Sequence, residues 1–138
     1  MNTPTTTLRL RAPLRAEIER IAKRTRRSFS EVTRELLGEA LRMRECPGIY
    51  FSDEPAGREA KIGGTGLGVW EVIQDYVAVG RDERPLKKSF HWLSEAQIKA
   101  ALLYYKKYPR EVQGLIAENE ALFREGSQGS TRRPARRA

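Results

Sequence analysis

The sequence TTLRLRAP at residues 6–13 decides the fold predicted for the start of this chain. Its first six residues alternate polar and apolar side chains with a period of two, which is the pattern of a half-buried β-strand. Leu8 and Leu10 fall on one face of such a strand. The opposite, polar face carries Thr7, Arg9 and Arg11. We therefore expect a strand at residues 6–11.

Two helices are predicted after this strand. Pro13 suits the first turn of a helix, because its missing N–H would have no intrahelical partner there. Apolar residues then recur at helical spacing as far as about Thr25, namely at Leu14, Ile18, Ile21 and Ala22. Ser28 and Glu31 form a capping box that opens a second helix. Its apolar stripe consists of Phe29, Val32, Leu36, Leu37, Ala40 and Leu41.

Residues 1–44 are too few to bury a stable core alone, and a lone strand leaves its backbone hydrogen bonds unmade. Both problems are solved if two copies pair their strands antiparallel and interlock their helices. The shared core of this homodimer would contain Leu8, Leu10, Ile18, Val32 and Leu36. The polar faces of the two strands would form a ribbon that fits the major groove of B-DNA, which is about 12 Å wide.

The segments TTLRLRAP and RRSFSEVTRELLGEAL, at residues 6–13 and 26–41, resemble the ribbon-helix-helix DNA-binding domain of the Arc/MetJ type. The resemblance covers residues 5–44. It implies base contacts from Thr7, Arg9 and Arg11, and phosphate contacts from Arg27, Ser28, Phe29 and Ser30. Arginine pairs with guanine, and a helix N-terminus binds anions, so the chemistry agrees. The alternative is a strand whose polar face meets only water, although such a face would normally include acidic residues.

The charge of the chain is unevenly distributed. The 138 residues include 26 Lys and Arg against 18 Asp and Glu, a net charge of +8. Residues 1–44 hold 11 basic and 5 acidic residues, residues 45–125 hold 11 and 13, and residues 126–138 hold 4 and none. This division predicts three parts: a DNA-binding and dimerisation domain, a second domain and a basic tail. Clustered positive charge fits a polyanionic partner, although a solvated basic face would look the same.

Several classes of protein are excluded by composition. A single Cys and a single His exclude a disulfide framework and a zinc site with three or four Cys or His ligands. No apolar stretch is long enough for a membrane span, and the N-terminus lacks a secretion signal. The acidic residues that a metal-dependent nuclease would need are scattered at Asp53, Glu54, Asp75, Asp82 and Glu83. We expect a cytoplasmic protein that is not an enzyme and uses no metal or cofactor.

The second domain, residues 45–125, is predicted to be mainly helical, with one short strand at residues 49–51. The glycine-rich segment KIGGTGLG at residues 61–68 misses the phosphate-binding patterns and is interpreted as a turn into a helix. Helices are predicted from Val69, from the capping box at Ser94, and from Pro109. The polar residues 81–88 are expected to connect the first two.

The segments GGTGLGVWEVI and HWLSEAQIKAALLYYKKYPREV, at residues 63–73 and 91–112, resemble a bacterial domain-of-unknown-function family with a helix-turn-helix-like core. Residues 61–113 carry the resemblance. The short helix usual in that family between these segments is replaced by Arg84-Pro85-Leu86. Members commonly accompany PIN-like ribonuclease toxins, so the resemblance implies an antitoxin.

The last part, residues 126–138, is predicted to be a disordered basic tail. Its cations can contact phosphates or an acidic partner, or can simply keep the chain soluble. They are Arg132, Arg133, Arg136 and Arg137.

The functional hypothesis is therefore a homodimeric antitoxin that binds operator DNA through its N-terminal ribbon, neutralises a PIN-like ribonuclease toxin through its second domain, and represses its own operon. The alternative is a stand-alone transcriptional regulator whose second domain binds a ligand or oligomerises. A nucleic-acid enzyme is the third and weakest hypothesis.

Overall fold

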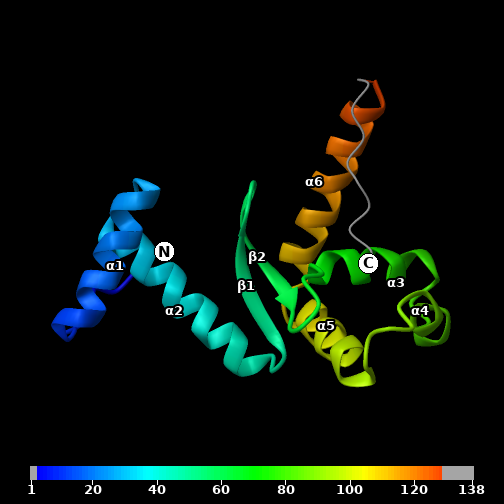
Figure 1. Cartoon of the computed structure of the whole chain (residues 1–138), viewed down its shortest axis with the longest axis horizontal. Helices are drawn as coiled ribbons and strands as arrows, with labels where there is room; N and C mark the ends of the chain where they lie inside the picture. Colours follow the sequence, from blue (N-terminus) through cyan, green and yellow to red (C-terminus); the bar gives the residue numbers. More distant parts are fainter. Residues whose placement is uncertain (1–2, 129–138) are drawn as a thin grey trace. The chain divides into compact units, whose positions relative to one another are not determined.

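The chain divides into two compact units, and this computed structural model describes residues 3–128. Unit 1 is Met1–Arg42 and unit 2 is Met43–Ala138, so the division falls two residues before the expected domain boundary. Figure 1 shows the order of the elements along the chain. Nothing in the described part of the chain forms a helix that is long and apolar enough to cross a membrane.

Unit 1 contains the two helices that the sequence predicts. Helix α1 is Ala12–Thr25, with Pro13 in its first turn, and α2 is Phe29–Glu45, which runs past the end of unit 1. Between them Arg26 adopts a left-handed conformation, and its N–H and that of Arg27 close the end of α1 on Ala22 O and Lys23 O. Its small core consists of three buried apolar side chains, which are those of Ile18, Ala22 and Val32.

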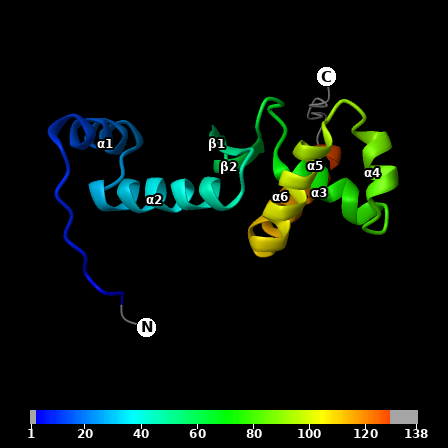
Figure 2. The same ribbon diagram turned by 90° about the horizontal axis from the view of Figure 1, so that it is seen from below.

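The N-terminal ribbon predicted for this unit is wrong. Residues 3–11 form no strand, and the two strands of the described chain lie instead between α2 and α3. A period of two places side chains on two faces, but a strand also needs a neighbouring backbone to receive its hydrogen bonds. No residue from 3 to 42 offers that edge, so the segment stays extended without a ladder (blue in Figure 2).

Unit 2 begins with a β-hairpin rather than with a single short strand. Strand β1, Ile49–Glu54, pairs antiparallel with β2, Gly57–Ile62, in a register that sets Ile49 opposite Ile62 and Glu54 opposite Gly57. Two residues, Pro55 and Ala56, therefore connect the strands, and Gly57 accepts the positive φ of 125° that follows the turn. The expected strand at residues 49–51 is the first half of β1.

Four helices follow the hairpin, where three were expected. They are α3 (Val69–Ala78), α4 (Glu83–Ser89), α5 (Glu95–Lys107) and α6 (Pro109–Gln128). Helix α4 occupies the segment expected to be a connection. Asp82 caps it by accepting the Arg84 N–H at 3.0 Å, and Pro85 lies in its first turn, where a missing N–H costs little. The second domain is thus a hairpin with four helices, not a purely helical domain.

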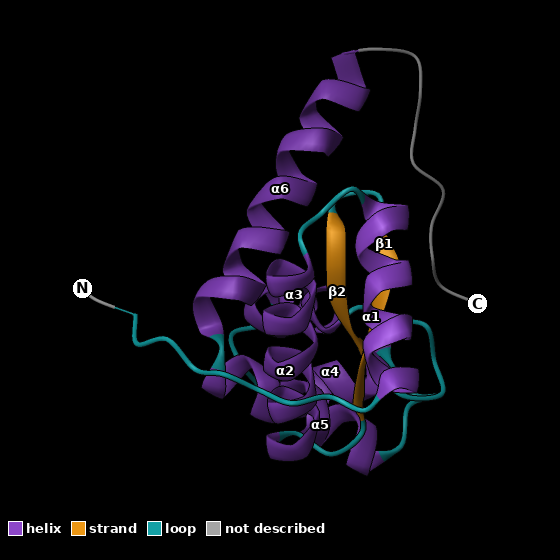
Figure 3. Cartoon of the chain, turned by 90° about the vertical axis from the view of Figure 1, so that its left-hand side faces the viewer, coloured by secondary structure: helices purple, strands orange, loops and turns teal. Residues whose placement is uncertain are grey.

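The core of unit 2 lies around α3, which packs against α4, α5, α6 and β2 (Figure 3). Val72 and Ile73 of α3 are fully buried there, together with Tyr104 of α5. Cys46 is buried in the same core, and this desolvation raises the pKa of its thiol.

The glycine-rich segment acts as a turn, as the sequence suggests. Its polar groups are satisfied within unit 2: Gly63 N–H donates to Gly48 O at 2.7 Å, and Gly68 N–H donates to the Glu71 carboxylate at 2.9 Å. Gln97, in the capping box of α5, donates to Gly63 O at 3.1 Å. Five N–H groups of the segment therefore have acceptors within unit 2, and these belong to Ile62, Gly63, Thr65, Leu67 and Gly68.

One buried cation stands at the start of this segment. The Lys61 side chain is 4% exposed and lies 3.3 Å from the Glu54 carboxylate and 3.2 Å from that of Glu59. A buried ammonium needs such partners, because its desolvation costs several kcal/mol. The attraction between the ammonium and a nearby carboxylate is of about the same size and offsets that cost. The ion triad thereby ties the two strands of the hairpin to each other.

Candidate nucleic-acid interface

The extended segment at residues 3–11 carries the residues expected to contact DNA bases. Thr7, Arg9 and Arg11 are exposed, whereas Leu10 is partly buried against the small core of unit 1. Arg11 is also the N-cap residue of α1, with extended backbone angles. Of the two leucines expected on the buried face, only Leu10 turns inward, whereas Leu8 is 55% exposed like the polar residues around it.

A second group of cations surrounds the turn between α1 and α2. Lys23 and Arg24 occupy the last turn of α1, and Arg26 follows in its left-handed conformation. All three side chains are exposed. The run KRTRR in the sequence already signals this cluster, but the sequence-based site did not include these three residues.

Arg27 lies at the same turn but has an intramolecular partner. Its guanidinium donates two hydrogen bonds to the Glu35 carboxylate, at 3.0 and 2.9 Å, and one to the Thr25 hydroxyl at 3.3 Å. The Arg27 side chain is 32% exposed. This paired, half-buried guanidinium holds the turn against α2. Because the Glu35 carboxylate already neutralises it, Arg27 would attract a phosphate less strongly than its exposed neighbours do.

The N-terminus of α2 is closed by the predicted capping box. Glu31 N–H donates to the Ser28 hydroxyl at 3.0 Å, and Ser28 N–H donates to the Glu31 carboxylate at 3.2 Å. This backbone hydrogen bond from Ser28 is the main reason that the pKa of Glu31 is lowered. Within residues 3–128, the N–H groups of Phe29 and Ser30 have no acceptor.

Two effects therefore compete at this helix end. The amides of Phe29 and Ser30 and the helix dipole favour an anion. The Glu31 carboxylate already supplies one negative charge at the same place and repels another. A phosphate can be held here as an additional contact, with the larger share of the attraction coming from the arginines nearby.

The acidic residues of unit 1 are mostly neutralised by specific partners. Glu17 pairs with Arg20 at 2.7 Å, and Glu19 pairs with Arg15 at 2.8 Å. In contrast, the side chains of six exposed cations form no ion pair or hydrogen bond among the residues that the structure describes, and these are Arg9, Arg11, Lys23, Arg24, Arg26 and Arg34. The net positive charge of this unit is thus carried by side chains that remain available to an outside anion.

The predicted site is only partly assembled. Ser28, Phe29 and Ser30 lie together at the start of α2, and the guanidinium of Arg15 covers the Phe29 ring at 5.0 Å, which links α1 to α2. Of the residues expected in the dimer core, Ile18 and Val32 are buried and Leu10 is partly buried. The other two are exposed, Leu8 to 55% and Leu36 to 37%. The four arginines of the tail, at residues 132–137, lie outside the described residues.

Comparison of the chain with protein-family models, with curated proteins and with solved structures finds no match.

Proposed function

We propose that this protein is a DNA-binding regulator of the antitoxin type, in which unit 1 binds operator DNA and unit 2 holds and neutralises a PIN-like ribonuclease toxin. The complex would repress its own operon. The observation that carries the DNA-binding half is the group of unpaired cationic side chains in unit 1, five of which lie on the segment at residues 9–11 and around the turn at residues 23–26. Unpaired, exposed guanidinium groups supply the phosphate attraction and base contacts that duplex DNA requires.

A second copy of the chain completes unit 1 in this proposal. Three buried apolar side chains among its described residues are too few to stabilise a unit of this size, and folds of about 40 residues usually need oligomerisation or cross-links. Large apolar residues nevertheless remain exposed, with Leu8 at 55%, Leu14 at 53%, Leu37 at 51% and Leu41 at 63%. Covering these side chains in a homodimer would supply the missing core.

The toxin-binding half rests on the family resemblance at residues 61–113 and on the presence in unit 2 of a closed core of its own. Neutralisation needs only a folded surface that binds the toxin, and the proposal assigns no catalytic step to this chain.

The DNA-binding half is tested with the double variant Arg9→Ala/Arg11→Ala. We expect it to lose about 1–3 kcal/mol of binding free energy per base contact on duplex DNA from its own promoter, measured by fluorescence anisotropy. The matched control is Lys99→Ala/Lys106→Ala, which removes two exposed cations from unit 2 and should change affinity little. Unchanged affinity of the first variant would remove the segment from the interface.

The division of labour is tested by deletion. A chain without residues 1–44 should lose DNA binding and dimerisation, yet still copurify with the toxin encoded by the adjacent gene. Copurification in the presence and absence of promoter DNA then shows whether toxin and DNA bind at the same time. If the chain without residues 1–44 lost toxin binding as well as DNA binding, the two partners would not bind at separate sites in the two units.

A further inference from the structure

The C-terminal half of α6 presents an apolar face that the described residues of unit 2 do not cover. Figures 1 and 3 both show this helix extending past the tip of the β-hairpin of the same unit. Leu115 and Ile116 are partly buried against the core of unit 2, but farther along the helix Leu122 is 56% exposed and Phe123 is 58% exposed. We call the residues Leu115, Asn119, Leu122 and Phe123 the distal α6 surface.

These residues form one continuous stripe. Leu115, Asn119 and Leu122 follow one another at spacings of four and three residues, which places them on one side of a helix. Phe123 lies beside Asn119, one turn farther along. A helix face of this kind, apolar apart from Asn119, is the surface that a second amphipathic helix covers.

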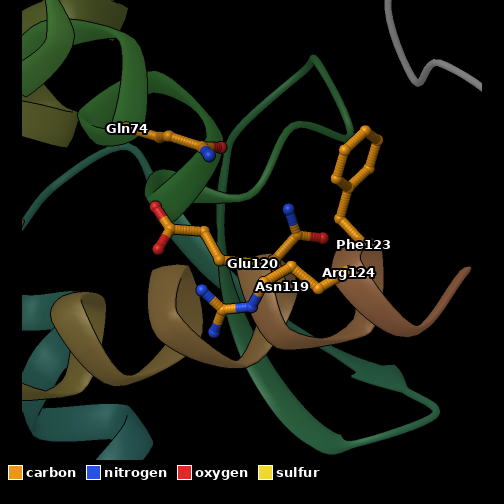
Figure 4. A pocket seen from close by; sticks show the side chains of 5 residues that line it. All are labelled: Gln74, Asn119, Glu120, Phe123 and Arg124. Atoms are coloured by element: carbon orange, nitrogen blue, oxygen red, sulfur yellow. The ribbon is translucent and has the colours of Figure 1, made fainter. Parts of the chain in front are cut away.

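A groove runs beside the stripe. It has a volume of about 370 Å³ and is lined by Gln74 of α3 and by Asn119, Glu120, Phe123 and Arg124 of α6. Figure 4 shows Gln74 across the groove from the side chains of α6. An apolar ring beside amide and charged groups gives an incoming side chain both a surface to pack against and hydrogen-bonding partners.

The charges next to the stripe indicate what covers it. Glu118 and Glu125 are exposed, lie seven residues apart on the Leu122 edge, and have no partner among residues 3–128. Between Leu115 and Gln128, α6 has three acidic residues and one basic residue. Carboxylates along one edge of an apolar stripe favour a partner whose own stripe is flanked by Lys or Arg.

Other occupants fit these charges less well. A second α6 packed antiparallel would set the edge with Glu118 and Glu125 against the same edge of its copy, which is repulsive. Nucleic acids and anionic membrane surfaces are negatively charged, so the carboxylates of Glu118 and Glu125 would repel them as well.

We infer that the distal α6 surface is the docking site for an amphipathic helix with a basic flank, supplied by a protein partner. The inference rests on the toxin-binding half of the proposed function, because the toxin is the partner that would supply this helix. It gives that half a specific surface.

The first test uses the full chain and a synthetic helical peptide of about 18 residues, with leucines at spacings of three and four and lysines along both edges. A matched peptide carries glutamate in place of lysine. We expect the lysine peptide alone to bind in fluorescence anisotropy, and Leu122→Ala/Phe123→Ala to weaken it by about tenfold or more. Trp92→Ala, which removes another 41% exposed apolar side chain of unit 2, is the control and should leave binding unchanged.

Charge reversal provides the second test. Glu118→Lys/Glu125→Lys should lose the lysine peptide and gain the glutamate peptide. Equal binding of both peptides to the unaltered chain, or binding that Leu122→Ala/Phe123→Ala leaves unchanged, would overturn the inference. Self-association that this double variant abolishes in sedimentation experiments would do the same, because a second copy would then be the occupant.

The toxin experiment separates this inference from the proposed function. If the chain binds the lysine peptide but no toxin copurifies, the proposed function fails and the docking surface stands. If the toxin copurifies equally well with Leu122→Ala/Phe123→Ala, the toxin binds elsewhere and the inference is overturned while the proposed function stands.

Discussion

Unit 1 and unit 2 differ most in how much apolar surface each buries by itself. Among the described residues, the core of unit 2 contains 17 buried side chains and that of unit 1 contains three. Unit 1 nevertheless has two helices with defined ends, since Arg26 closes the end of α1 and the Ser28 capping box opens α2, and it leaves leucines such as Leu37 and Leu41 exposed. Local signals therefore set where a helix begins and ends, whereas the stability of that helix depends on how much apolar surface its packing covers.

Separating the two units gives the largest expected effect. A fragment of residues 43–138 should unfold cooperatively, with a melting temperature independent of concentration. A fragment of residues 1–42 should be folded only as an oligomer, so its melting temperature should rise with concentration. Circular dichroism at several concentrations measures both, and a monomeric, cooperatively folded fragment of residues 1–42 would break the comparison.

A truncation inside the core of unit 2 comes next in size. Ile73 is fully buried in α3, and Ile73→Ala should cost about 2–5 kcal/mol of unfolding free energy in urea denaturation, since it removes packed methyl groups and leaves a cavity. Val77, on the same helix, is 43% exposed, and Val77→Ala should change stability by no more than about 0.5 kcal/mol. Equal effects at the two positions would mean that α3 is not packed as described.

A single added methyl group tests the tight packing of unit 2. A Cβ at Gly68 would lie 2.6 Å from the Glu59 carboxylate and 2.8 Å from the Trp70 ring, so Gly68→Ala should cost about 1–3 kcal/mol. At Gly114, inside α6, a Cβ meets nothing within 4 Å. Gly114→Ala should therefore stabilise the protein, by about 1 kcal/mol from helix propensity. Thermal unfolding of both variants measures the contrast.

The smallest expected effect is the pH dependence of the capping box in unit 1. The Ser28 N–H holds the pKa of Glu31 below its usual value, so the stabilisation from this carboxylate is complete above the usual glutamate pKa. It is lost as the pH falls through the lowered pKa of the folded state. Glu31→Gln keeps an acceptor without the ionisation, so its melting temperature should vary less over this acidic range. An identical pH profile would exclude the linkage.

The prediction of unit 1 from sequence succeeded for both helices and failed for the strand. Pro13, Ser28 and Glu31 act locally, and local signals of this kind are visible in a sequence. A strand at residues 6–11 depends on a partner backbone, and no periodicity in the chain itself reports whether that partner is present.

In unit 2, the sequence-based prediction missed β2 and α4. Strand β2 contains Glu59 and Lys61, which are normally exposed, yet both are buried here because they compensate each other's charge. Helix α4 was missed because the segment at residues 81–88 is short and mostly polar, although the Asp82 cap two residues before Arg84 was a usable signal.

The candidate interface was predictable where it depends on composition and not where it depends on pairing. The positive charge at Arg9 and Arg11 can be read from the sequence. That Arg27 is held by Glu35, eight residues away, follows from how α1 turns into α2 and appears only in the structure.

The burial of Cys46 offers a way to watch unit 2 open. It is the only thiol in the chain, and its side chain has no exposed surface. Because only the thiolate reacts, and burial disfavours the thiolate, a thiol-specific reagent should modify this residue only during transient openings. The labelling rate would then measure how often unit 2 opens around the Cys46 sulfur, without any introduced probe. A slower rate in the presence of a partner would show that binding makes these openings rarer.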